Sequence, residues 1–348
     1  MYCSKEESDA LFEGRCKWQF DNIYTSMYTG GSHQTEFDGE TLPSLYNKIT
    51  ENIANGKSLE TLAQAIHNIY AKKLSIAPVK VVKMNDLDCS AAFGRLLADS
   101  DKSVIGYSDE VFGFCPTVLF CNMIHETKHV QQAYNVHNFV NFGVLPKSDK
   151  EKLLLLFVAF NYSGFMFDNE LPYYLQPKEI DAFFYELQEI SKLNAQYPNK
   201  FNGLGYYNEF GTRIFEILYN FEYNKNGMYS KGLKLIYKTL KRGMFSASKG
   251  LYGQDMKSLC TQLKLSGFNL EKAFASFIKD LDVMHETVVL LADDVRSLGL
   301  KAKFEKNGNL IYHPQKVSYI NPLGISSNLN KTFIAMSNDI DDKYFSQK

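Results

Sequence analysis

The stretch CPTVLFCNMIHETKHVQQAYNV, residues 115–136, decides the fold of this chain. Pro116 suits the first turn of a helix, where its missing N–H leaves no hydrogen bond unmade, and the segment predicts a helix from about Pro116 to Tyr134. His125 and His129 are four residues apart, so a helix places them on one face, about one turn from each other. We therefore expect a helix that presents two imidazoles side by side.

Residues His125-Glu126-Thr127-Lys128-His129 form an HExxH pattern. Two imidazoles at this spacing can coordinate one tetrahedral Zn²⁺. Glu126 follows the first histidine, so it would project beside the metal, take a proton from the attacking water and pass it to a leaving group. The pattern predicts a zinc site with His125 and His129 as ligands and Glu126 as the general base.

A small sheet is expected directly before this helix. The residues from Pro78 to Met84 are rich in β-branched side chains and predict a strand. Two more apolar runs, Ala91 to Leu97 and Ser103 to Ser108, flank a polar turn and predict a hairpin.

Helices are predicted on both sides of this unit. One ends near Gly56 and the next runs from about Ser58 to Leu74. A helix is expected over about Lys150 to Phe160, and Pro177 opens another whose apolar stripe predicts packing on a core. The stripe consists of Ile180, Phe183, Phe184, Leu187 and Ile190. Asn307-Gly308 predicts a late hairpin over residues 303–313.

We therefore expect an α+β chain in which a small twisted sheet and the HExxH helix are embedded in mostly helical surroundings. The expected parts are a helical N-terminal region (1–75), the core with the motif (76–193), a mostly helical C-terminal region (194–334) and a polar tail (335–348).

The composition of the chain limits the classes of partner that it is expected to bind. The 348 residues include 38 Lys+Arg and 39 Asp+Glu, a net charge of -1, so we expect no nucleic acid and no membrane as partners. Lys231, Lys234, Lys238, Lys241 and Arg242 form a basic stripe at helical spacing, typical of a solvated helix face, with an anionic partner as the alternative. No secretory leader is visible, no cysteine pair has CxxC spacing, and Leu153 to Phe160 is too short to cross a bilayer. These features predict a cytoplasmic protein.

The segment SVIGYSDEV…TVLFCNMIHETKHVQQAY, followed fifty residues after His129 by QPKEIDAFFYE, resembles the zincin superfamily of metallopeptidases. It is most similar to the gluzincin pattern, and it also resembles small bacterial and phage-type zincin domains, including the repressor-cleaving kind. The resemblance covers about Pro78 to Leu193 and implies that a Glu on a downstream helix is the third ligand. The metzincin pattern fits less well, because Gln132 and Asn135 stand where it needs Gly and His.

Glu179 is the expected third ligand, with Asp181 and His137 as alternatives. Pro177 places Glu179 in the first turn of a rigid helix, on the side of Phe183, whereas Asp181 lies about 200° round the helix. The simpler interpretation is that Glu179 is a helix N-terminal acid that interacts with the macrodipole. Phe183 stands four residues after Glu179, where thermolysin-like proteins have an Asp, so the partner that orients the histidine ligands stays unidentified.

The resemblance further implies that an edge strand near the metal pairs with substrate, and we expect Val104 to Ser108 to be that strand. An oxyanion-stabilising residue is not singled out among several candidates. These are Tyr173, Tyr174, Tyr206, Tyr207, His285 and His313.

The predicted function is zinc-dependent hydrolysis of a peptide bond in a protein or peptide substrate. One alternative is a binding or regulatory module that keeps the zincin fold with a structural metal or none. Another is hydrolysis of a different bond, because HExxH fixes the metal and the base but not the substrate. The sequence does not indicate the oligomeric state.

Overall fold

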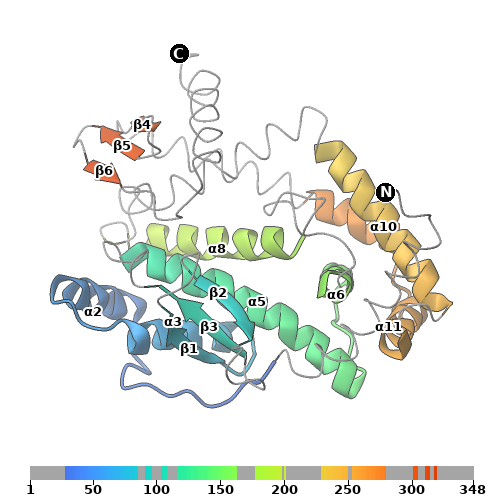
Figure 1. Ribbon diagram of the computed structural model, residues 1–348, viewed down its shortest axis with the longest axis horizontal. Helices are drawn as coiled ribbons and strands as arrows, with labels where there is room; N and C mark the ends of the chain where they lie inside the picture. Colours follow the sequence, from blue (N-terminus) through green and yellow to red (C-terminus); the bar gives the residue numbers. More distant parts are fainter. Residues whose placement is uncertain are drawn as a thin grey trace, which may run out of the picture.

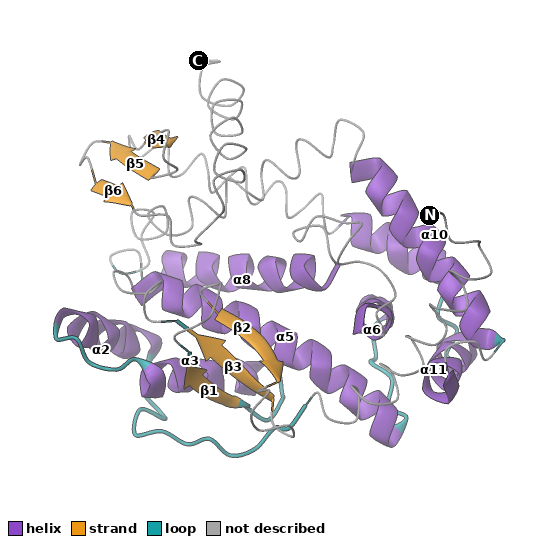
Figure 2. Ribbon diagram, viewed as in Figure 1, coloured by secondary structure: helices purple, strands orange, loops and turns teal. Residues whose placement is uncertain are grey.

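The computed structural model describes the chain in eleven stretches. They are residues 28–84, 91–95, 103–108, 116–162, 177–197, 200, 229–249, 253–279, 301–304, 310–313 and 317–319. Helices account for most of these residues (Figure 2), with two small sheets, which agrees with the α+β class expected from the sequence.

Two helices come first, α2 (Leu42–Ala54) and α3 (Glu60–Lys73). The Thr41 side chain accepts a hydrogen bond from the backbone N–H of Ser44 and so caps the first turn of α2. Gly56 ends this helical segment with a φ of 61°, a left-handed conformation that glycine adopts without strain. Leu45 and Ile49 turn one face of α2 toward the core.

The first sheet has three strands, β1 (Lys80–Lys83), β2 (Ala91–Arg95) and β3 (Ser103–Tyr107), in the order β1-β3-β2. β2 and β3 pair antiparallel, which confirms the predicted hairpin. β1 pairs parallel to β3 on its other side. The prediction that residues 104–108 form an edge strand is therefore wrong. β3 is central and buried along its length, because it lies between its hairpin partner β2 and the preceding strand β1.

Side chains of α3 cover the outer edge of β1. The backbone N–H of Val81 donates to Gln64 Oε1 at 2.7 Å, and Gln64 Nε2 donates to the carbonyl of Val79 at 2.9 Å. The N–H of Val79 donates to His67 Nε2 at 3.0 Å. These bonds occupy the backbone groups that another strand would need.

The helix that carries the motif, α5 (Pro116–Phe142), runs through the middle of the molecule (Figure 1). It contacts α3, β2 and α8 (Pro177–Gln196). Its C-terminus lies eight residues beyond the predicted end near Tyr134. α6 (Asp149–Tyr162) confirms the predicted helix, and its residues 153–160 are all buried.

The C-terminal helices α10 (Tyr229–Ser248) and α11 (Gly253–Leu265) pack on α6 and on each other. Buried apolar side chains from α2 through α11 form one continuous cluster. A second sheet has the strands β4 (Lys301–Phe304), β5 (Leu310–His313) and β6 (Val317–Tyr319), and the β4–β5 pairing confirms the late hairpin. Within the described stretches, every helix is too short or too polar to cross a membrane.

Candidate metal centre

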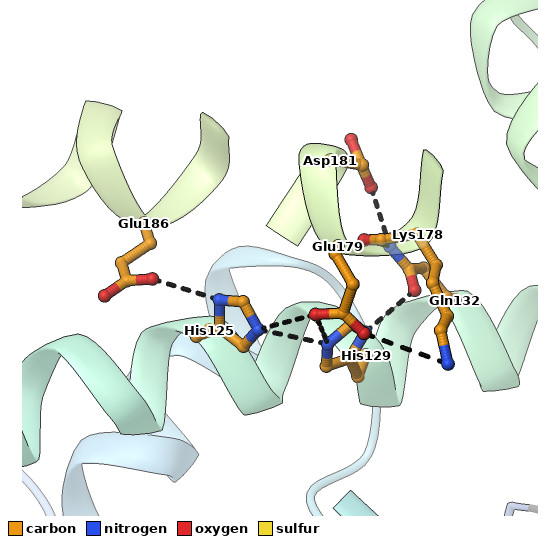
Figure 3. A network of polar contacts seen from close by, with 7 residues as sticks. All are labelled: His125, His129, Gln132, Lys178, Glu179, Asp181 and Glu186. Carbon is orange, nitrogen blue, oxygen red and sulfur yellow. Dashed lines mark hydrogen bonds and ion pairs between the residues drawn. The ribbon is translucent and has the colours of Figure 1, made fainter. Parts of the chain in front are cut away.

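Three side chains from α5 and α8 converge in the core (Figure 3). His125 Nε2 and His129 Nε2 are 3.1 Å apart, and Glu179 Oε2 lies 3.3 Å from the first and 3.2 Å from the second. All three residues are buried and together form a group that can hold a metal ion. The structure thus brings the predicted ligands together, including Glu179 from the first turn of α8.

The spacing of these atoms fits a tetrahedral ion. For bonds of about 2.0 Å, the ligand atoms around a tetrahedral Zn²⁺ are about 3.3 Å from each other. The three separations in this site, 3.1, 3.2 and 3.3 Å, are close to that length. The triangle therefore matches one face of a zinc coordination sphere and leaves the fourth vertex for another ligand.

The tautomers of the histidines leave lone pairs at the centre. His125 Nδ1 donates to the Glu186 carboxylate at 3.0 Å. His129 Nδ1 donates to Gln132 Oε1 at 3.0 Å, since the amide nitrogen of Gln132 donates elsewhere. With a proton on each Nδ1, both neutral imidazoles direct an unprotonated Nε2 at the Glu179 carboxylate. The lone pairs on these two nitrogens and on the carboxylate oxygen repel one another unless a cation or a proton lies between the three atoms.

The pKa values of His125 and Glu179 are also shifted in the directions that favour positive charge in the site. Burial alone lowers the pKa of His125, but hydrogen bonds with Glu179 and Glu186 outweigh it and raise the pKa to about 10. Burial would raise the pKa of Glu179, yet when the imidazoles are protonated at Nε2, the charge of His129 and hydrogen bonds from both rings hold the Glu179 pKa well below its usual range. The site therefore attracts a proton or a metal cation at neutral pH.

Glu186 is the orienting partner of His125 that the sequence did not identify. It lies seven residues, about two turns, after Glu179, so both carboxylates face α5 from one side of α8. Its side chain has no exposed surface. The ring of Phe183, between the two acids, packs against His125 with centroids 4.4 Å apart. A charged acceptor and an aromatic wall therefore fix this imidazole.

His129 is oriented by a different, neutral group. Gln132 holds its Nδ1, and the Gln132 amide nitrogen donates to the carbonyl of Lys178 at 2.9 Å and to Asp181 Oδ2 at 3.1 Å. Asp181 also pairs with Lys128 at 3.3 Å. Asp181 is thus not one of the three converging residues. It nevertheless contacts α5 through the side chains of Gln132 and Lys128.

Two further charges lie beside the three ligands. Glu126 is only 6% exposed, and its charge helps to raise the pKa of His125. Lys178 Nζ lies 3.8 Å from Glu179 Oε1, the carboxylate oxygen that faces away from the imidazoles. One oxygen of Glu179 thus faces the imidazoles and the other an ammonium group.

The back of the motif helix is anchored to α3. His67 is fully buried, and because its Nε2 accepts the Val79 N–H, its Nδ1 carries the proton and donates to Thr127 Oγ1 at 2.7 Å. The Thr127 hydroxyl in turn donates to the carbonyl of Met123 at 2.5 Å. This chain of hydrogen bonds fixes α5 on the side opposite the three ligands.

His137, the remaining candidate ligand, lies away from the three converging side chains. His137 is on the last turns of α5, where it contacts Asn141 and packs against Tyr28, so it is not a ligand. The candidates Tyr173, Tyr174, Tyr206, Tyr207 and His285 fall outside the described residues, and His313 is described only as part of β5. Glu186 and Gln132 are the partners of the two histidines that sequence reasoning missed. The two-turn spacing of Glu186 from Glu179 was the available signal.

Comparisons of the chain with protein-family models, with curated proteins and with solved structures find no match.

Proposed function

We propose that this protein is a zinc-dependent hydrolase of peptide bonds. The observation that carries the proposal is the convergence of three atoms of metal-ligating type, two imidazole nitrogens and a carboxylate oxygen, at tetrahedral spacing, with the Glu126 charge acting on His125. Three protein ligands are typical of catalytic zinc, which keeps one position for water or substrate, whereas structural zinc normally has four.

Each residue has a distinct task in the proposed reaction. His125, His129 and Glu179 hold the ion, which when bound polarises the scissile carbonyl and lowers the pKa of its water to about 7. Glu126 accepts the proton of the attacking water and delivers it to the leaving amine. Glu186 and Gln132 keep both imidazoles in the Nδ1–H tautomer, so that their Nε2 atoms stay available.

A peptide substrate needs backbone partners, and among the described residues the outer edge of β2 is the edge of the first sheet that no other strand or α3 side chain covers. α3 covers the outer edge of β1, and β3 is central. In the described part of the chain β2 pairs only with β3, and it contacts the motif helix. We therefore place the substrate backbone along the outer edge of β2, in the role that the sequence had assigned to β3.

Zinc binding and general-base catalysis are tested with separate variants. We expect about one Zn²⁺ per chain by elemental analysis, and loss of that zinc in the His125→Ala, His129→Ala double variant. Glu126→Gln should keep the zinc and the fold but lose roughly 10²-fold or more of the activity, because glutamine cannot take the proton. A matched control is Glu60→Gln, an acid in the first turn of α3 that has no part in the site.

Substrates can be found by comparing protein N-termini in cells that express the wild type or Glu126→Gln. New N-termini that depend on Glu126 would support peptide-bond hydrolysis. Zinc-loaded protein with no Glu126-dependent cleavage would instead support the binding-module alternative, and a chain that takes up no zinc would contradict both the metal site and the reaction.

A further inference from the structure

The charge of this chain is unevenly distributed. Residues 229–279, which contain α10 and α11, include ten Lys or Arg and only two Asp or Glu, which leaves 28 basic and 37 acidic residues in the rest of the chain. The net charge of -1 therefore conceals a helical region with an excess of eight positive charges. The chain average that argued against an anionic partner does not apply to this region.

On α10 the positive charges share one face. Lys238, Lys241, Arg242 and Phe245 lie within an arc of about 100° on a helix with 3.6 residues per turn. All four are exposed, Phe245 to 65%. Lys249, one residue past the end of the helix, lies with its ammonium 5.6 Å from the centre of the Phe245 ring. The sequence of α10 contains no acidic residue.

The opposite face of α10 is firmly docked. Ile236, Leu240 and Ala247 are buried. A Cβ on Gly243 would come within 2.6 Å of the Phe160 ring of α6, so the glycine permits a close approach of the two helices. The rotation of α10 is thereby fixed, and its basic face is held outward at one end of the molecule, beyond α6 from the small sheet (Figure 1).

We propose that this face of α10 binds the surface of a membrane that contains anionic lipids. Lysines at a lipid surface are attracted to the negative headgroups, and a neighbouring exposed aromatic ring can enter the boundary between headgroups and acyl chains. Phe245, flanked by three cations, has that position. The apolar face of α10 is already buried against α6, so the helix would lie on the membrane and not span it.

Single-stranded nucleic acid is the competing polyanion, and two observations disfavour it. Nine of the ten basic residues are lysines, whereas nucleic-acid sites favour the planar fork of arginine. Proteins that bind single strands also use a charged groove with several stacking platforms, whereas α10 offers a convex helix face with one ring. A flat lipid surface fits that shape better.

The test is co-sedimentation of the zinc-loaded full chain with vesicles. We expect binding to phosphatidylcholine vesicles that contain phosphatidylserine, weaker binding as salt rises, and little binding to phosphatidylcholine alone. Each lysine at the surface contributes about fivefold to affinity, so Lys238→Gln, Lys241→Gln should bind about 25-fold more weakly. The matched control is Lys57→Gln, Lys72→Gln, which removes two exposed charges near α2 and α3.

A second pair of variants tests the aromatic ring. Phe245→Ala should weaken vesicle binding although it leaves the charge unchanged. Phe245→Trp should restore binding, and its emission should shift to the blue when anionic vesicles are added. Zinc content and circular dichroism of every variant show whether it has folded.

Three results would overturn the proposal. They are equal affinity for neutral and anionic vesicles, equal loss in both lysine pairs, and vesicle binding too weak to measure together with binding of a single-stranded oligonucleotide that depends on Lys238 and Lys241. None of them bears on the zinc site, because α10 contributes no residue to it.

Discussion

Glu186 touches no metal position, yet it determines which nitrogen of His125 carries a proton. Its carboxylate has no exposed surface and accepts from Nδ1 at 3.0 Å, so Nε2 keeps its lone pair for an ion. A neutral acceptor such as Gln132 provides the same orientation for His129 without the charge. The two histidines are therefore unequal, and His125 is the one made more basic by its partner.

We predict that Glu186→Gln lowers zinc affinity by about 10- to 100-fold, the range typical of lost orienting partners. The substitution keeps the size of the side chain and removes its charge, so His125 becomes a weaker ligand. Zinc affinity can be measured by competition with a chromogenic chelator.

Glu189→Gln is the matched control, because Glu189 is also a buried acid of α8 but pairs with Lys73 and Lys192. Equal zinc affinity in Glu186→Gln and wild type would contradict the orienting role. An equal loss in both variants would point to a general weakening of α8.

The predictable part of the site was the part with a fixed local spacing. The pairing of His125 with His129 follows from the helix period, and Glu179 follows from the gluzincin resemblance together with a helix start fixed by Pro177. Glu186 and Gln132 could not be assigned, because their roles depend on how α8 lies along α5. That alignment is set by packing such as the contact of Phe183 with His125, which is absent from any single helix.

At the scale of elements, α3 is the anchor of the motif helix. His67 joins three elements through two hydrogen bonds, from the Val79 N–H before β1 and to Thr127 of α5. It can do so only as a neutral imidazole, because a second ring proton would face the Val79 N–H. Burial, with a smaller contribution from His33, lowers the pKa of His67 to about 3.

We predict that this histidine makes the fold acid-sensitive above the range where carboxylates titrate. The pKa of His67 is about 3 when folded and about 6.5 when unfolded, so the unfolded chain binds more protons between these values. The contribution of neutral His67 to the free energy of unfolding is then fully present above pH 6.5. It falls by up to about 1.4 kcal/mol per pH unit as the pH decreases toward 3.

The measurement is urea unfolding of wild type and His67→Asn from pH 7.5 to 4.5, with a chelator present so that metal release does not contribute. His67→Asn should be less stable at pH 7.5, and its stability should change less with acid. Parallel curves for the two proteins would show that His67 does not titrate as the buried neutral group described above.

At this scale, the sequence predicted the features that depend on neighbouring residues and did not predict those that depend on contacts between distant segments. The hairpin of β2 and β3 and the helices around the motif were readable from apolar spacing and turn residues. The central position of β3 could not be predicted in this way, because it depends on parallel pairing with β1, a strand outside the hairpin. The length of α5 was also underestimated, since its last turns lack a strong stop signal before Gly143.

For the molecule as a whole, the candidate metal site spans two helices that are far apart in sequence. α5 supplies both histidines, and α8 supplies Glu179, Glu186 and the groups that hold Gln132. A bound cation would relieve the repulsion among these groups, so metal binding would be linked to the docking of α8. An ion present at about a thousand times its dissociation constant adds about 4 kcal/mol to stability.

We predict that chelation loosens this junction before the rest of the core. Hydrogen exchange should speed up in α8 and in the middle of α5, while α3 and α6 change little. Zinc added back should restore protection in wild type but not in Glu179→Ala. Uniform exchange changes across all four helices would contradict a local linkage.

The hydrogen bonds that Gln64 and His67 accept from the backbone of Val81 and Val79 affect how copies of this chain behave toward one another. An uncovered strand edge offers a template for strands of neighbouring molecules and is a common start of aggregation. Here the amides of Val79 and Val81 are occupied by side chains of the same chain. Because the β1 edge is closed, crowded copies have one fewer place to join their sheets, and substitutions in α3 should reveal themselves first as poor solubility.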